Sequence, residues 1–251
     1  MAFVTDLRDL FNKKYYQAFE CSAVIAAAGT SQRMGGEDKL FMELFGAPVL
    51  AHTLIAYQKC AAINELIIVS REECFARINE ICKRYSIGKV AKVTTGGPTR
   101  LDSVIKGVFA ASTEARLIAI HDGARPCIDC NVIESTVKAA GKFSAAAPAV
   151  KVIPTIKRIH NGVIIETVDR EDLVEIQTPQ VFDADLIKAA LAKARNESVN
   201  VTDDCSAVEL LGFPVRITNG SVNNIKITST DDLVIAEAIL RNRMQNVECK
   251  T

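Results

Sequence analysis

The feature that most constrains the fold is a regular alternation of short apolar runs with segments of helical periodicity. The apolar runs lie at residues 23–28, 66–69, 90–93 and 117–120. The segments with helical character begin near residue 48 and cover 72–85 and 100–111. Strands this apolar are typical of a parallel sheet whose two faces are covered by helices. The sequence therefore predicts an α/β fold with a mostly parallel, twisted sheet and helices on both faces.

The second half of the chain predicts a protruding β-arm at about residues 151–172. Two strand-like runs, 155–159 and 163–167, are joined through Asn161-Gly162, a pair that tolerates the positive φ of a tight hairpin turn. Beyond the arm we expect helices at 184–194, 203–211 and 231–244, and short strands near Val215 and Ile225.

Composition places the chain among globular proteins and argues against several partners. About half of its 251 residues are apolar, and the 30 basic residues balance 30 acidic ones. A balanced charge gives no general attraction to nucleic acid or to an anionic membrane surface. No run approaches the length of a membrane span and no secretory signal is present, so we expect a cytoplasmic protein. We interpret residues 1–19 as an N-terminal extension and 20–251 as one domain.

Eight cysteines are scattered through apolar or helical segments, as buried free thiols are in a reducing compartment. Cys127 and Cys130 have the spacing of zinc ligands in C-I-D-C. No second C-x-x-C or C-x-x-H completes a set of four. We therefore interpret the cysteines as structural.

A loop rich in small residues follows the first strand: A-A-A-G-T-S-Q-R-M-G-G-E-D-K, residues 26–39. It is neither a Walker A loop nor a dinucleotide fingerprint. Small residues let backbone N–H groups approach phosphate oxygens, and Arg33 and Lys39 supply positive charge. Since ligands of α/β sheets bind beyond the carboxyl ends of the strands, the loop predicts a triphosphate site. The alternative is a surface loop with solvated charges.

Two further loops follow strands in the same way. In T-T-G-G-P-T-R-L-D-S-V, residues 94–104, Gly97 allows close approach to a planar base, and Ser103 can bond to its edge. In H-D-G-A-R-P, residues 121–126, Asp122 is a candidate ligand for ribose or Mg²⁺, which prefers oxygen ligands. Asp122 and Arg125 could equally form an ion pair that braces a turn.

Four later segments extend the pattern: V-D-R at 168–170, Q-T-P-Q-V-F at 177–182, V-T-D-D-C-S-A-V-E at 201–209 and N-N-I-K-I-T at 223–228. With the three loops, in this order, the chain resembles the 2-C-methyl-D-erythritol 4-phosphate cytidylyltransferases of the non-mevalonate isoprenoid pathway. The resemblance covers nearly everything from about residue 20 to 243. It implies a Rossmann-like nucleotidyltransferase fold and transfer of a cytidylyl group from CTP to the sugar-alcohol phosphate, with release of pyrophosphate.

The resemblance also implies roles for the nucleotide-site residues. Those that would contact CTP are Ala27, Ala28 and Gly29 at the phosphates, Gly97 and Ser103 at the cytosine, and Asp122 at the ribose and Mg²⁺. Arg33, Lys39 and Lys226 would be catalytic, because they neutralise charge on the α-phosphate and on the departing pyrophosphate.

The remaining implied residues concern the acceptor and the assembly. Arg170 and Thr178 would anchor the acceptor phosphate, and Thr202 and Thr155 would complete the acceptor site. The family's arm reaches across a dimer, so the resemblance implies a homodimer in which Arg170 completes the partner's site.

Three alternatives stay open. A ribitol-5-phosphate cytidylyltransferase would share the fold, CTP and the metal, and only the acceptor would differ. A non-catalytic CTP sensor would bind nucleotide without the cations Arg33, Lys39 and Lys226, whose joint presence argues against it. A scaffold protein would leave these cations without a purpose.

Overall fold

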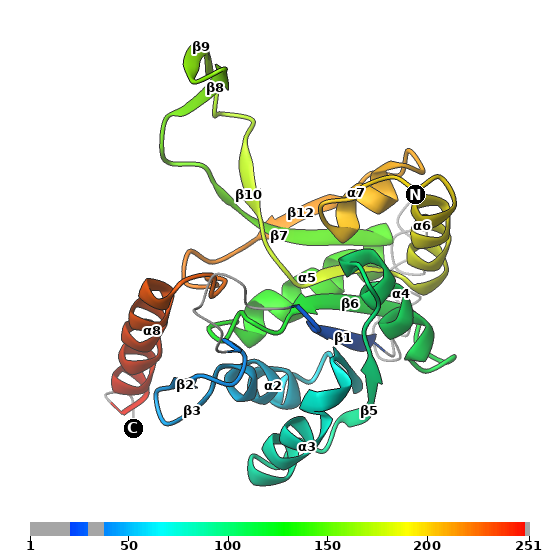
Figure 1. The fold of residues 1–251 in the computed structure, drawn as a ribbon, viewed down its shortest axis with the longest axis vertical. Coiled ribbons are helices and arrows are strands. Elements are labelled where there is room, and N and C mark those ends of the chain that lie inside the picture. Colours follow the sequence, from blue (N-terminus) through cyan, green and yellow to red (C-terminus); the bar gives the residue numbers. More distant parts are fainter. Residues whose placement is uncertain (1–20, 30–37, 249–251) are drawn as a thin grey trace, which may run out of the picture.

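The computed structural model describes residues 21–29 and 38–248, and its centre is an eight-stranded sheet (Figure 1). The expected N-terminal extension lies outside the described residues, and so does Arg33. None of the helices in the described part of the chain combines the length and the apolar character that a membrane crossing requires.

The order of the strands confirms the predicted, mostly parallel sheet. Along the sheet they are β10 (Val174–Ile176), β7 (Ala145–Lys151), β11 (Gln180–Asp183), β6 (Leu117–Asp122), β1 (Cys21–Ala27), β4 (Glu65–Ser70) and β5 (Val90–Thr95), with β12 (Arg216–Asn219) also paired to β7. The strands β6, β1, β4 and β5 are parallel to one another, and β12 is parallel to β7. The antiparallel strands are β11, between β6 and β7, and β10 at the edge.

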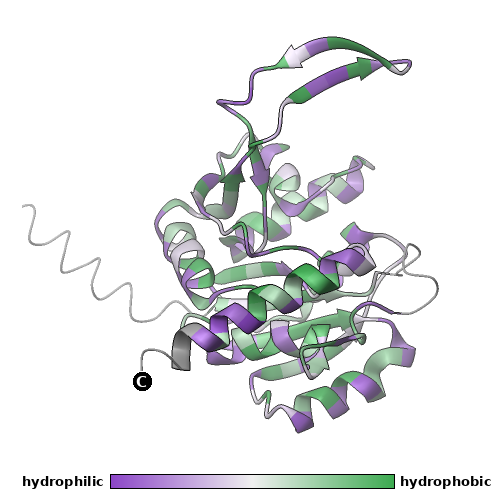
Figure 2. Ribbon diagram, turned by 90° about the vertical axis from the view of Figure 1, so that its left-hand side faces the viewer, coloured by the Kyte–Doolittle hydropathy of each residue, from purple (hydrophilic) through white to green (hydrophobic). Residues whose placement is uncertain are grey.

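Alternate side chains of the central strands feed two hydrophobic cores. In β1, Ile25 belongs to one core and Val24 to the other, as the two-residue period of a strand requires. Figure 2 shows the hydrophobic colouring of these inner strands. The helices of the first core are α2 (Val49–Lys59), α3 (Phe75–Arg84), α5 (Cys130–Phe143) and α8 (Thr230–Glu248). Those of the second are α4 (Arg100–Ala110), α6 (Ala184–Asn196) and α7 (Asp204–Glu209).

Side-chain caps determine where the helices of the second core begin. The Thr99 side chain accepts a hydrogen bond from the Asp102 N–H at the start of α4, and Asp183 caps α6 in the same way. At α7, Asp203 and Ser206 form a reciprocal capping box. Such caps satisfy N–H groups that have no partner within the helix. The Thr99 cap sets the first turn of α4, and this turn borders the candidate site described below.

Two parts of the sequence interpretation need correction. The strand expected near Ile225 is wrong: the segment after β12 is irregular, and it is fixed by the buried Asn224 side chain and by the Ile227 N–H, which donates to the Ala124 carbonyl at 2.8 Å. The helix expected over 72–85 is divided, since a 3₁₀ turn (Glu72–Cys74) precedes α3. The helix α5 and the strand β7 were not assigned from the sequence.

The arm is an antiparallel hairpin of β8 (Ile156–His160) and β9 (Val163–Val168), which projects from the body in Figure 1. At its turn, Asn161 and Gly162 have φ values of 48° and 79°, a left-handed conformation that these two residue types adopt most readily. A second, much shorter hairpin pairs β2 (Glu43–Leu44) with β3 (Ala47–Pro48), just before α2.

Candidate active site

A cavity of about 730 Å³ lies at the carboxyl ends of β1, β4, β5 and β6. The order of the strands reverses beside β1, because the chain proceeds outward to β4 and β5 and then returns to place β6 on the other side. A crevice at such a reversal is the usual ligand site of an open α/β sheet. Its lining brings together these residues proposed from the sequence: Ala27, Ala28, Gly29, Lys39, Gly97, Ser103, Asp122 and Lys226.

Arg71 bonds to residues at both ends of the loop that follows β1. Its guanidinium donates to the Gly29 carbonyl at 3.1 Å, to Asp38 Oδ2 at 2.5 Å and to Glu73 Oε1 at 2.7 Å. It therefore ties together the residues on either side of segment 30–37. The sequence interpretation missed Arg71, although its position directly after β4 was an available signal, since parallel strands end at one edge of the sheet.

The second loop packs its backbone tightly against the start of α4. The Gly97 N–H donates to Ser103 Oγ at 2.9 Å, and the same hydroxyl donates to the Thr99 carbonyl at 3.0 Å. A Cβ atom added at Gly97 would lie 2.3 Å from the Asp102 Cβ, so the close approach requires glycine. The Ser103 hydroxyl thus organises the loop that the sequence assigns to a base.

Arg100, the first residue of α4, also lines the cavity. It makes a two-pronged ion pair with the buried Asp204, at 3.0 Å and 2.6 Å. Burial raises the pKa of the Asp204 carboxyl, and the Arg100 charge opposes that shift. The pair joins α4 to α7 and fixes a cation at the rim, which the sequence interpretation had not singled out.

Asp122, the last residue of β6, is a carboxylate that lines the cavity and lies between two cations. Its Oδ2 lies 3.0 Å from Lys226 Nζ and 3.3 Å from Arg125 Nε. Burial alone would raise the pKa of Asp122, but Lys226 and Arg125 outweigh burial and lower it to about 2. The carboxylate is therefore ionised at neutral pH. The ion pair between Asp122 and Arg125, which the sequence offered as an alternative to a ligand site, is present. Lys226 is a second cation paired with the same carboxylate.

Lys39 and Lys226 approach the cavity from one side. The Lys39 ammonium donates to the Ile227 carbonyl at 2.8 Å, directly after Lys226 in the chain. A contact between residues this far apart in sequence places the cation of the first loop beside the segment that carries the second cation. Lys226 is partly exposed, so its charge is available both to Asp122 and to a bound anion.

Thr178 supports the Asp122 strand from behind and is not part of the cavity lining. Its hydroxyl oxygen accepts from the Asp122 N–H at 3.2 Å and lies 3.0 Å from Nδ1 of the buried His121. Burial lowers the pKa of His121 to about 3, so the ring is neutral at pH 7.

Three other residues proposed for the acceptor lie outside the cavity. Thr155 and Arg170 are exposed on the arm, where the Arg170 guanidinium donates to the Ile153 carbonyl. Thr202 is exposed in the segment before α7. A single copy of the chain therefore does not bring them to the nucleotide loops.

The charges of the lining residues and their positions indicate which ligand the cavity can bind. The lining contains cations, small residues and three acidic side chains (Glu72, Glu73 and Asp122), of which Asp122 is held ionised between two cations, a set that suits a polyphosphate with a divalent cation. Among the described lining residues there is no histidine or cysteine, and the two serine hydroxyls are bonded to backbone carbonyls. Nothing in this set resembles an activated nucleophile.

Comparisons with known proteins agree with this geometry. The family model for 2-C-methyl-D-erythritol 4-phosphate cytidylyltransferase matches residues 21–242. The enzyme of that name from Halalkalibacterium halodurans is 44% identical over 225 residues, which cover 89% of this chain and 98% of the relative. One from Dehalococcoides mccartyi is 42% identical, covering 87% and 95%.

Solved structures give the same result. The 4-diphosphocytidyl-2C-methyl-D-erythritol synthase of Anaerococcus prevotii superposes with a TM-score of 0.81 at 31% identity, covering 91% of this chain and 99% of that one. The cytidylyltransferase of Thermus thermophilus gives a TM-score of 0.75 at 31% identity, covering 89% and 100%.

Proposed function

Because the chain belongs to the 2-C-methyl-D-erythritol 4-phosphate cytidylyltransferase family, we propose that it transfers a cytidylyl group from CTP to 2-C-methyl-D-erythritol 4-phosphate and releases pyrophosphate. The observation that carries the proposal is the cavity at the strand ends, where Asp122 is held ionised beside Lys226 and where Lys39 also belongs to the lining. The reaction would belong to isoprenoid precursor biosynthesis.

The three loops divide the nucleotide between them. The backbone of Ala27, Ala28 and Gly29 contacts the phosphates, because these residues have little or no side chain to keep an anion away. Gly97 and Ser103 contact the cytosine. Asp122, at the end of β6 on the opposite side of β1 from β4 and β5, contacts the ribose and the phosphates.

The chemical step is an in-line displacement at the α-phosphorus of CTP. An oxygen of the acceptor phosphate forms the new P–O bond, the bond to the bridging α,β-oxygen breaks, and the electron pair leaves with pyrophosphate. A phosphate monoester is already ionised near pH 7, so no strong base is needed. Arg33, Lys39 and Lys226 stabilise the charge that develops, which makes positioning and electrostatics the source of catalysis.

A magnesium ion fits the residues present. Asp122 offers a hard, ionised oxygen ligand, and both of its ion pairs among the described residues are made through Oδ2. Magnesium typically binds one or two carboxylates together with substrate phosphates. When bound, the ion supplies neutralisation of phosphate charge. Asp122 itself holds the ligand position, and Lys226 and Arg125 keep it deprotonated.

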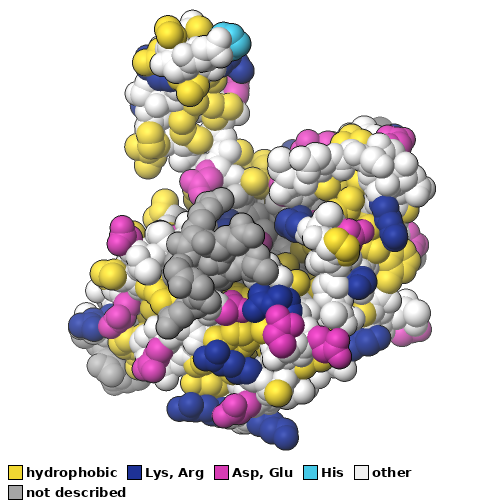
Figure 3. Space-filling view, viewed as in Figure 1, with side chains coloured by type: hydrophobic (Ala, Val, Ile, Leu, Met, Phe, Trp, Pro, Cys, Tyr) yellow, Lys and Arg dark blue, Asp and Glu magenta, His cyan; other side chains and the backbone are white. Residues whose placement is uncertain are grey.

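The acceptor site would be completed by a second copy of the chain, so we propose a homodimer formed through the arm. The arm exposes apolar side chains, including Ile153 (74% exposed), Val163 (63%) and Ile164 (61%), and Figure 3 shows hydrophobic groups on it. Such a surface is expected to be covered by protein. In the dimer, Arg170 and Thr155 of the arm would meet the partner's cavity, Arg170 would grip the acceptor phosphate, and Thr202 would complete the pocket, whereas the buried Thr178 would act only by supporting the Asp122 strand.

Pyrophosphate release from CTP and Mg²⁺ tests the proposal, with 2-C-methyl-D-erythritol 4-phosphate and ribitol 5-phosphate offered separately. Preference for the first acceptor supports it. Preference for the second reassigns the acceptor and leaves the chemistry intact. Measurable CTP binding with no release for either acceptor contradicts the proposal and supports a nucleotide sensor; the reaction without acceptor is the control for CTP hydrolysis.

A further inference from the structure

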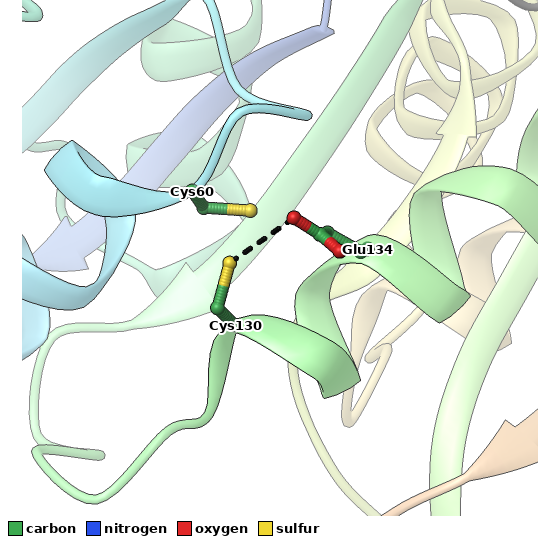
Figure 4. Close-up of side chains that lie close together, drawn as sticks. All are labelled: Cys60, Cys130 and Glu134. Carbon is green, nitrogen blue, oxygen red and sulfur yellow. Dashed lines mark hydrogen bonds between the residues drawn. The ribbon is translucent and has the colours of Figure 1, made fainter. Parts of the chain in front are cut away.

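Two thiols and a carboxylate meet in the first core's helix layer, outside the lining of the cavity. Cys60 caps the carboxyl end of α2, Cys130 is the first residue of α5, and Glu134 lies one turn later on α5. Figure 4 shows the three side chains converging. Their donor atoms all lie within 4.8 Å of one another, and Cys130 Sγ is 3.3 Å from Glu134 Oε1.

This cluster differs from the pair that the sequence pattern suggested. Cys127, the other cysteine of C-I-D-C, is buried and donates to the Ala236 carbonyl of α8 at 3.7 Å. Cys130 instead faces Cys60, from a distant part of the chain. The spacing of the motif therefore has no bearing on the cluster, which only the packing of α2 against α5 creates.

The backbone holds the three donors in place before any ligand binds. Asp129 caps α5 by accepting from the Asn131 N–H at 2.8 Å, which defines the turn that carries Cys130. Cys130 and Glu134 are four residues apart and so lie on one face of the helix. On the other side, the Lys89 ammonium donates to the Cys60 carbonyl at 2.7 Å and fixes the end of α2.

We propose that Cys60, Cys130 and Glu134 bind a divalent cation of the zinc class, with water as the fourth ligand. Zinc takes cysteine sulfur at about 2.3 Å and carboxylate oxygen at about 2.0 Å in a tetrahedron. That geometry separates sulfur from oxygen by roughly 3.5 Å, close to the 3.3 Å between Cys130 and Glu134. Two sulfur donors exclude magnesium and calcium, which prefer oxygen ligands.

The surroundings suit such an ion. Cys60 is buried, Cys130 is half-buried and Glu134 is exposed, so the ion can enter from solvent on the Glu134 side. Burial raises the pKa of both thiols, and the cation must therefore displace their protons as it binds. Two thiolates and a carboxylate would leave one negative charge around a doubly charged ion, and Lys89 lies nearby to balance it.

A bound ion would join two elements that flank the Asp122 strand. The α2 residue Tyr57 packs on His121 with ring centroids 4.9 Å apart, and Cys60 ends the same helix. The segment that follows Asp122 leads directly into α5 and Cys130. The ion would thus connect, behind the cavity, the helix that contacts His121 with the helix that follows Asp122.

Cobalt titration of the full-length protein tests the site. The protein is stripped with a chelator, kept reduced with a non-thiol reductant, and titrated with Co²⁺, whose bonds to thiolate give charge-transfer absorption. We expect one equivalent of Co²⁺ with this absorption, its displacement by one equivalent of Zn²⁺, and a Tm that rises with Zn²⁺ concentration. Loss of one ligand, in Cys130→Ser or Glu134→Gln, should weaken binding by at least about tenfold.

Cys82→Ser on α3 is the matched control, because it removes a partly buried thiol that lies outside the cluster. Glu134→Gln changes an exposed side chain and keeps the test valid should a cysteine variant fold poorly. The proposal is overturned if the wild-type protein shows no thiolate absorption with Co²⁺. It is also overturned if Glu134→Gln and Cys82→Ser bind Co²⁺ with equal affinity. A third contradicting result is a Cys60–Cys130 disulfide in a protein that binds no metal when it is reduced. The titration contains no CTP, so its result is independent of the proposed transfer reaction.

Discussion

The cavity and the arm are opposite kinds of surface on one chain. In the cavity, charged groups are paired and partly buried: Asp122 with Lys226 and Arg125, and Arg100 with Asp204. On the arm, the ion pair of Arg158 with Glu166 is exposed, and large apolar side chains face solvent. The charged groups of the cavity therefore find their partners within the same chain, whereas the large apolar side chains of the arm remain exposed.

This difference teaches which proposed roles need a second chain. The charged side chains of the nucleotide site are held in place by ion pairs within one chain, so the nucleotide loops do not need a second chain to bind their ligand. An exposed apolar hairpin is costly to leave in water, at about 25 cal/mol for each Å² that a partner could cover. The acceptor residue Thr155 directly precedes that hairpin and Arg170 follows it, and their proposed role therefore depends on dimerisation.

The largest expected effect comes from removing one of the proposed catalytic cations. Lys39→Ala and Arg33→Ala should each lower kcat by roughly 10²–10³-fold, because a charge that stabilises the transition state is lost. Steady-state pyrophosphate release measures this loss, and circular dichroism verifies the fold. Lys138→Ala, an exposed lysine on α5, is the control. Activity equal to that control in both variants would remove the cations from the mechanism.

The next effect concerns Arg170 and the partner's site. Arg170→Ala should raise the KM for the acceptor by about 10–100-fold, since a charge-assisted hydrogen bond is lost, and should leave CTP binding unchanged. Arg158→Ala on the same arm is the control. If sites are shared, an equal mixture of Lys39→Ala and Arg170→Ala protomers should recover about a quarter of wild-type activity, because half the dimers carry one intact site. If subunit exchange is verified and no activity is recovered, Lys39 and Arg170 belong to a site formed by a single chain.

A charge on the arm tests whether its apolar surface is an interface. Ile164→Glu should weaken dimerisation by about 10–100-fold, as expected for an apolar side chain that loses its burial. Sedimentation velocity over a range of concentrations measures the change. Val234→Glu on α8 is matched, because Val234 is also a large exposed apolar residue (71%) but lies away from the arm. Equal effects of the two substitutions would contradict an arm-mediated dimer.

The smallest expected effect is the dependence of stability on pH that Asp122 contributes. Its pKa in the folded chain, about 2, is below the ordinary value of 3.8, so the unfolded chain takes up the proton first. The stabilisation is present above pH 3.8 and is lost as the pH falls towards 2, a difference of about 2 kcal/mol.

Urea unfolding of wild type and Asp122→Asn across this pH range measures that contribution. The gap in unfolding free energy between them should narrow as the pH falls. The control is Glu166→Gln, whose exposed ion pair with Arg158 contributes little. A gap that is independent of pH would show that Lys226 and Arg125 do not stabilise the ionised carboxylate.

Local patterns in the sequence determined the fold class and most of the nucleotide loops. Apolar runs predicted β1, β4, β5 and β6, and parallel strands necessarily bring the loops that follow them to one edge. That is why the sequence alone predicts that Gly29, Gly97 and Asp122 lie at the same edge of the sheet. The turn at Asn161-Gly162 was equally local, because it depends on the φ preferences of two residues.

Only the tertiary structure decided which side chains meet across the sheet. It paired Lys226 with Asp122, attached Arg71 to Gly29, turned Thr178 inward towards His121, and brought Cys60 to Cys130. It also replaced the expected strand at Ile225 with a segment held by Asn224. The physical reason is that periodicity reports the local backbone, whereas these partners depend on how distant helices and strands pack, and no spacing in the sequence encodes that arrangement.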